Sequence, residues 1–126
     1  IPDLKFVHVI RDPRDVVASY LGVRWAPNKI DDAIDWYSSI MNKWLFNKST
    51  LAEDFFLEIK LENLVKDPNS VIQSICDHFL IPWDDVLLTQ KLNRSNTGRW
   101  VNQFSSQEKA ILNKKLKPFL DLYEYN

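Results

Sequence analysis

A basic residue and a hydroxyl stand eight positions apart near the start of the chain, and these residue types suit the binding of a phosphate. Arg11 follows the short apolar run Leu4–Ile10, and Ser19 lies in a segment that begins like a helix. A guanidinium grips phosphate oxygens in a bidentate way, and a serine hydroxyl can donate to the same anion. Pairing of Arg11 with a carboxylate and packing of Ser19 explain the spacing equally well. The residue types alone leave both interpretations open.

The elements around this pair predict how it is positioned. Leu4–Ile10 is β-branched and almost continuously apolar, which is typical of a buried parallel strand. Asp12 is suited to cap the next helix, Pro13 fits its first position, and Asp15 complements the positive end of its dipole. Ligands of open α/β sheets bind beyond the carboxyl ends of the strands. We therefore expect Arg11 and unpaired amides of this helix to face an anion there.

Strands and helices alternate along the rest of the chain. The predicted elements are, in chain order, a long helix from Ile30 to Lys48, a strand over Phe55–Ile59, a helix that follows Lys66–Asn69 and ends at Pro82, a short helix over Asp84–Lys91, a loop over Asn93–Gln103 and a last helix opened by the capping box Ser105–Glu108. Two strands are too few for a whole sheet, so the pattern predicts part of an α/β fold.

Composition limits the classes of function. The chain has 126 residues, which suffices for one small domain. Apolar residues make up 45% and charged residues 26%, an ordinary globular composition. Sixteen basic and 17 acidic residues leave a net charge of −1, which argues against bulk binding of nucleic acid or of a membrane surface. Any anion site must therefore be local.

Several residue types are scarce. Cys76 is the only cysteine, which excludes a disulfide framework and a cysteine zinc cluster, and no metal site is expected. Gly22 and Gly98 are the only glycines, too few for a phosphate-cradling P-loop. No apolar run has membrane-spanning length and no signal peptide opens the chain, so a reducing compartment, the cytoplasm, is favoured. Because the chain begins at Ile1 and its one methionine is Met41, we interpret it as a fragment.

Four stretches of the chain resemble one family in the same order. Pro2–Tyr20 (PDLKFVHVIRDPRDVVASY) resembles the 3′-phosphate-binding segment of the sulfotransferases that use 3′-phosphoadenosine 5′-phosphosulfate (PAPS). Leu61–Pro68, Phe79–Trp83 and Asn93–Trp100 are similar to later stretches of these enzymes. The resemblance implies an α/β, P-loop NTPase-like sulfotransferase fold, here a partial parallel sheet with flanking helices, mostly helical. It makes residues 1–126 the C-terminal portion of a single domain, without the upstream 5′-phosphosulfate loop.

The resemblance also implies the ligands of the donor. In that family an arginine that ends a strand and a serine eight residues later bind the 3′-phosphate, and Arg11 and Ser19 match both. The late loop closes over the same phosphate, which adds Arg94 and Gly98. Arg99 is a further candidate because it follows Gly98 and can turn inward. A solvated basic loop is the alternative for Arg94 and Arg99.

Some positions depart from the family pattern. Leu61 stands where many members have a tyrosine near the adenine, and Asn93 and Ser95 replace family residues beside Arg94. The family's phosphosulfate lysine and its catalytic base precede this segment. His8 lies in a strand and His78 on a helix flank, where structural roles are expected. We therefore assign no catalytic residue.

The resemblance implies transfer of a sulfuryl group from PAPS to a hydroxyl or amine, with 3′-phosphoadenosine 5′-phosphate (PAP) as the product. The acceptor is a small molecule, a carbohydrate or a protein, and the segment alone is expected to be inactive. Acceptor identity and oligomeric state stay open. Two alternatives remain: a nucleotide kinase on a related P-loop scaffold, and a non-catalytic truncated module that binds a partner through its tryptophan-rich helix.

Overall fold

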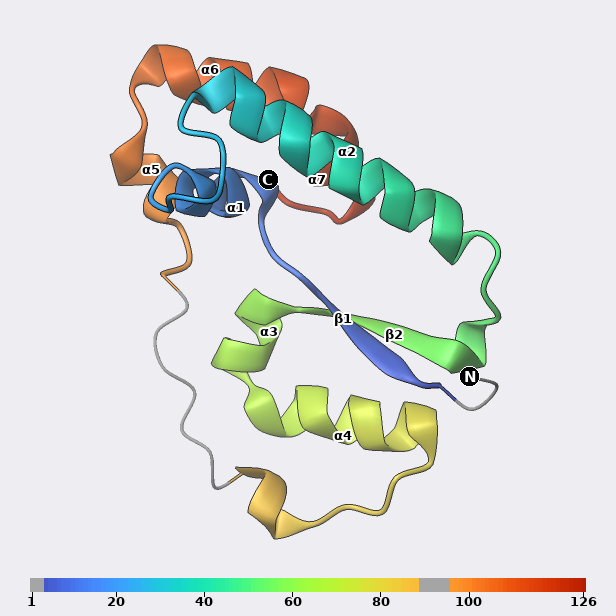
Figure 1. The fold of residues 1–126 in the computed structure, drawn as a ribbon. Coiled ribbons are helices and arrows are strands. Elements are labelled where there is room, and N and C mark those ends of the chain that lie inside the picture. Colours follow the sequence, from blue (N-terminus) through green and yellow to red (C-terminus); the bar gives the residue numbers. More distant parts are fainter. Residues whose placement is uncertain (1–3, 89–95) are drawn as a thin grey trace. The chain divides into compact units, whose positions relative to one another are not determined.

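The computed structural model describes residues 4–88 and 96–126, which fall into two compact units. Within this part of the chain, unit 1 contains residues 4–11 and 50–88, and unit 2 contains residues 12–49 and 96–126. In Figure 1, unit 1 holds both strands and the yellow-green helices, and unit 2 holds the short blue helix, the long cyan-to-green helix and the orange and red helices. Arg11 therefore belongs to unit 1, and Ser19 belongs to unit 2.

Unit 1 is a parallel strand pair with helices beside it. Its elements are β1 (Phe6–Ile10), the 3₁₀ turn η1 (Glu53–Phe55), β2 (Phe56–Lys60), α3 (Leu61–Lys66), α4 (Pro68–Phe79) and the 3₁₀ turn η2 (Asp85–Leu88). The strands pair in register from Phe6 opposite Phe56 to Ile10 opposite Lys60, and the first pair stacks its rings 6.1 Å apart. The predicted parallel pairing is confirmed, but of the strand that was expected to be buried only Ile10 is, because the sheet has just two strands among the described residues. Helix α4 runs along one side of the pair (Figure 1).

The ends of the unit 1 elements differ from the prediction in detail. Asp67 caps α4 by accepting from the main-chain N–H of Ser70 at 3.2 Å. The helix ends at Phe79, before Pro82, because Leu80 adopts a left-handed conformation with φ of 56°. The segment after β2, for which no helix was predicted, forms α3, and the short helix expected over 84–91 is the 3₁₀ turn Asp85–Leu88 within the described residues.

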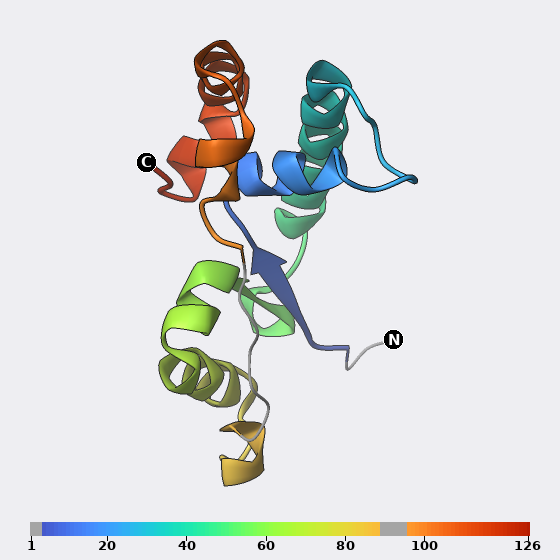
Figure 2. The same cartoon turned by 90° about the vertical axis from the view of Figure 1, so that its left-hand side faces the viewer.

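Unit 2 is helical. Its elements are α1 (Pro13–Tyr20), α2 (Ile30–Lys48), α5 (Arg99–Gln103), α6 (Ser106–Lys115) and α7 (Lys117–Leu122). The predicted bounds of α2 are confirmed, and one face of this helix buries Ala33, Ile34, Tyr37 and Met41. Figure 2 shows α1 (blue) lying between α2 (teal) and the C-terminal helices (orange to red), in agreement with its contacts to α2 and α5.

The C-terminal helices of unit 2 start at well-defined caps. Both halves of the predicted capping box are present: Ser105 Oγ accepts from the N–H of Glu108 at 3.2 Å, and Glu108 Oε1 accepts from the N–H of Ser105 at 2.9 Å. The prediction of a loop up to Gln103 is wrong, because residues 99–103 form α5. The last predicted helix is two helices, α6 and α7, that meet at Leu116.

These elements form an α/β fold with a small parallel sheet and flanking helices, mostly helical, as predicted. The core of unit 2 gathers residues from α1, α2, α6 and α7, and Val17, Leu112 and Leu116 are fully buried there. Across residues 4–88 and 96–126, every helix is too short or too polar to cross a membrane. The helix that carries Ser19 is thus held inside a packed helical unit.

Candidate functional site

The start of α1 is closed by Asp12. The N–H of Arg14 donates to Asp12 Oδ1 at 2.9 Å, and the N–H groups of Asp15 and Val16 donate to the Asp12 carbonyl at 3.0 and 3.1 Å. Pro13 has no N–H to offer. The expectation that this helix presents unpaired amides to an anion is therefore wrong, because Asp12 already accepts from the first turn. The amides of Arg14, Asp15 and Val16 are therefore not available to an anion.

Arg14 belongs to the interior of unit 2. Its side chain makes a bidentate ion pair with Asp12, with Nη2 2.7 Å from Oδ2 and Nε 3.0 Å from Oδ1. Nη1 donates to Asn113 Oδ1 at 3.0 Å, and Nη2 donates to the main-chain oxygen of Asn126 at 2.7 Å. The guanidinium also lies 4.0 Å from the ring centroid of Trp100. Arg14 is a structural cation, a role for which its place in the sequence gave no signal.

Asp15 joins α1 to the late segment. Its side chain is fully buried, and Oδ2 accepts from the N–H of Gly98 at 2.8 Å while Oδ1 accepts from the N–H of Trp100 at 3.1 Å. Gly98 has φ of 83°, which only glycine adopts without strain. The sequence suggested only a dipole interaction for Asp15, because its partners lie more than 80 residues away.

Arg99 is tied to the residue that precedes Ser19. Its Nε donates to Gln103 Oε1 at 3.1 Å, and Gln103 Nε2 donates to the carbonyl of Ala18 at 3.0 Å. The Arg99–Gln103 spacing of four residues puts both side chains on one face of α5. Ser19 and Arg99 are each partly exposed. Ser19 thus lies on a helix that contacts α5, and Gly98 and Arg99 lie at the start of α5. Gln103 was missed because no helix was predicted there.

Arg11 and Arg94 are the other two predicted ligands. Arg11 directly follows the carboxyl end of β1 in unit 1, as predicted, and it is partly exposed with a buried Nε atom. Arg94, with its neighbours Asn93 and Ser95, lies outside the described residues. Shared binding of one anion by Arg11, Ser19 and Arg94 stays a prediction.

The two histidines have structural partners. His8 Nδ1 lies 3.3 Å from Glu58 Oε2 across the strand pair, and His78 Nε2 lies 3.0 Å from the carbonyl of Glu53. Cys76 is buried in α4. Within residues 4–88 and 96–126, no group of three His, Cys, Asp or Glu residues is placed to hold a metal ion. Both histidines thus have partners within unit 1, and the assignment of no catalytic residue stays a prediction.

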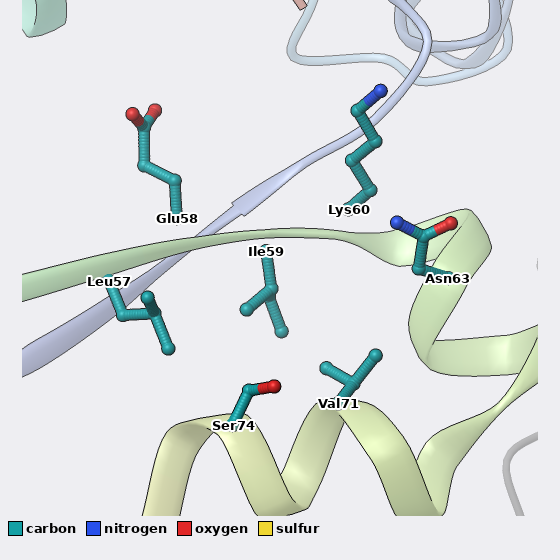
Figure 3. A pocket seen from close by; sticks show the side chains of 7 residues that line it. All are labelled: Leu57, Glu58, Ile59, Lys60, Asn63, Val71 and Ser74. Carbon is teal, nitrogen blue, oxygen red and sulfur yellow. The ribbon is translucent and has the colours of Figure 1, made fainter. Parts of the chain in front are cut away.

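A hollow of about 400 Å³ lies between β2 and α4 in unit 1. Figure 3 shows Leu57 and Ile59 pointing toward Val71 and Ser74 of α4, whereas Glu58 points to the other side of the strand. A second hollow of about 400 Å³ adjoins it at the start of α4. Arg11, Ser19, Gly98 and Arg99, the predicted phosphate ligands that the structure describes, line neither hollow. We interpret the first as a loosely filled layer between strand and helix.

Two comparisons with known proteins find similarity to this chain. The sequence profile of the Sulfotransferase family matches residues 1–85. No curated protein matches the chain in sequence. Among solved structures, the sulfotransferase domain of the olefin synthase from Synechococcus PCC 7002 superposes with a TM-score of 0.60 at 24% identity. This match covers 88% of the present chain and 41% of that domain, and at such identity it shows the fold alone.

Proposed function

This chain belongs to the sulfotransferase family, and from that premise we propose that it supplies the part of the enzyme that binds the 3′-phosphate of PAPS. Family and fold together support a sulfotransferase role. PAPS as the donor, and the ligands named here, are the further steps of the proposal. The chain spans less than half of the solved domain that it matches, so the reaction of the whole protein is proposed as well.

The observation that carries the proposal is the attachment of residues 98–103 to α1. Two stretches that separately resemble phosphate-binding segments of the family are far apart in the sequence. In unit 2 they are joined by the bonds of Asp15 to Gly98 and Trp100 and by the bond of Gln103 to Ala18. Ser19 and Arg99 consequently lie on two helices that contact each other, which is compatible with their binding one phosphate.

The charges on these helices suit a phosphate. The carboxylate of Asp12 is neutralised by Arg14 at 2.7 Å, and the carboxylate of Asp15 is buried against two amides. Arg99 uses its Nε toward Gln103, and a guanidinium carries further donors on its terminal nitrogens. A hydrogen bond to a charged group contributes about 1.5–3 kcal/mol. Arg11, Ser19, Arg94 and Arg99 would thus distinguish a nucleotide with a 3′-phosphate from one without it.

The reaction proposed for the whole enzyme is sulfuryl transfer to a hydroxyl or amine of a small molecule, a carbohydrate or a protein. Bound PAPS supplies the sulfuryl group, whose bond to the 5′-phosphate breaks as the acceptor oxygen or nitrogen bonds to sulfur and loses its proton. The residues of this chain would act by holding the donor's ribose phosphate, which fixes the orientation of the nucleotide. Proton transfer is assigned to no residue of this chain.

Nucleotide-dependent thermal stability tests the proposal in the full-length protein. PAP should raise the melting temperature clearly, and 5′-AMP at the same concentration should raise it much less. A ligand at a hundred times its Kd stabilises by about 2.7 kcal/mol, which a melting curve resolves. Equal shifts from the two nucleotides would favour a nucleotide kinase. The absence of a shift from either would favour a non-catalytic interaction module.

A further inference from the structure

We propose that Asp15 is a positioning residue that presets the Gly98–Trp100 turn for the 3′-phosphate without touching the phosphate. This inference rests on the proposed function. It concerns only unit 2, where α1 and α5 lie side by side. It assigns a role in donor binding to a carboxylate, a group that would repel the anion if it faced it.

The Asp15 carboxylate binds two main-chain N–H groups of the late segment at once. Each carboxylate oxygen accepts one main-chain N–H, Oδ2 from Gly98 at 2.8 Å and Oδ1 from Trp100 at 3.1 Å. The side chain has 0% exposure, so water does not compete for these bonds. The Asp15 carboxylate lies on the packed helix α1, whereas the two N–H groups that it binds are those on either side of Arg99. Two fixed amides on either side of Arg99 determine the direction of its backbone.

Other contacts hold the rest of the late segment. The guanidinium of Arg14 stacks on Trp100 at 4.0 Å, and Gln103 donates to Ala18 at 3.0 Å. Neither contact is made by the Asp15 carboxylate itself. Loss of that carboxylate should therefore loosen the first turn of α5 and leave the segment attached to α1. The expected consequence is a wider range of Arg99 orientations, and with it weaker binding of the phosphate.

Asp15→Asn in the full-length protein tests this role. The asparagine keeps the shape and one acceptor but points an NH₂ group at a main-chain N–H. We expect the Kd for PAP to rise about tenfold or more, since one charge-assisted contact is misplaced, while the Kd for 5′-AMP stays unchanged. Asp67→Asn is the matched control, because Asp67 also accepts a main-chain N–H at a helix start but in α4, and it should leave both values unchanged.

A second measurement on the unaltered protein needs no variant. If Asp15 presets the turn, the amides of Gly98 and Trp100 exchange slowly without nucleotide, and PAP adds little protection. Rapid exchange that slows only with PAP would show that the ligand forms the turn, and would overturn the inference.

The failures are distinguishable. Unaltered protein that binds PAP no better than 5′-AMP would refute the proposed function itself. Preference for PAP that persists in Asp15→Asn would refute only the role of Asp15. If Asp15→Asn binds both nucleotides equally more weakly, and its amide hydrogens exchange faster throughout α6, then Asp15 acts on stability. That result would also refute the positioning role.

Discussion

The two units differ in how completely they bury their apolar residues. Among the described residues, unit 1 buries three apolar side chains, Ile10, Phe56 and Cys76, whereas unit 2 buries eleven. A two-stranded sheet beside helices leaves strand faces and edges partly covered, as the half-exposed Val9 shows. Unit 2 therefore has the interior of a small helical bundle. The comparison teaches that the helix carrying Ser19 rests on the better-packed unit.

Two ion pairs, one from each unit, differ strongly in burial. In unit 2 the Asp12–Arg14 side chains are 11% and 5% exposed. In unit 1 the Lys5–Asp54 pair, at 3.8 Å, has side chains that are 43% and 75% exposed. Exposed pairs contribute little to stability, whereas removing one partner of a buried pair leaves an uncompensated charge. Ion pairs of similar composition should thus respond very differently to mutation.

The largest expected effect is that of Arg14→Ala. The substitution removes the cation that pairs with Asp12 and stacks on Trp100, and it leaves a buried carboxylate. We expect a loss of about 3–5 kcal/mol in the free energy of unfolding. Lys5→Ala should cost less than about 1 kcal/mol. Urea unfolding measures both, and similar costs for the two variants would contradict the contrast between the buried pair and the exposed pair.

A smaller effect is expected at alkaline pH through Tyr37. The side chain is buried against Phe119, with ring centroids 5.5 Å apart, and burial raises the pKa of its phenol well above the usual value. The unfolded chain therefore loses this proton first. Stability from this group is complete below pH ~10 and then falls by about 1.4 kcal/mol per pH unit.

The Tyr37→Phe variant tests whether Tyr37 causes this loss of stability at alkaline pH. The variant should lack this part of the decline above pH ~10 in urea unfolding followed from pH 8 to 11. An unchanged pH dependence would show that Tyr37 does not titrate with unfolding.

The smallest expected effect compares the two glycines. Gly98 has φ of 83° with open space where a Cβ would stand, so Gly98→Ala is strained by its backbone and should cost about 1 kcal/mol. At Gly22 an added Cβ would meet the Ser19 carbonyl at an ordinary 3.6 Å. Gly22→Ala should therefore be neutral or stabilise by up to about 1 kcal/mol. Melting curves of both variants measure the difference, and effects of the same sign would refute it.

Local patterns explain what the sequence could predict. The spacing of Ile34, Tyr37 and Met41 sets the buried face of α2, and the Ser105–Glu108 capping box sets the start of α6. Asp12 was recognised as a cap because its partners are its own neighbours. These features depend on residues within a few positions of one another, so a single sequence contains the information.

Contacts between distant segments explain what it could not predict. Helix α5 is short and polar, and it begins where Asp15 accepts from Gly98 and Trp100, more than 80 residues along the chain. The interior role of Arg14 likewise depends on Asn113 and Trp100. Hydrophobic periodicity and helix propensity do not predict contacts between residues so far apart in the sequence. The residues that shape the candidate site were therefore missed, although the proposed ligands beside them were named.

The most direct test of the central claim is calorimetric binding of PAP and 5′-AMP to the full-length protein and to its Arg11→Ala variant. Arg11→Ala should weaken PAP binding by roughly one to two orders of magnitude, which corresponds to about 1.5–3 kcal/mol for one contact to a charged phosphate, and should leave 5′-AMP binding nearly unchanged. Unaltered PAP affinity, or an equal loss for both nucleotides, would contradict the assignment of Arg11 to the 3′-phosphate.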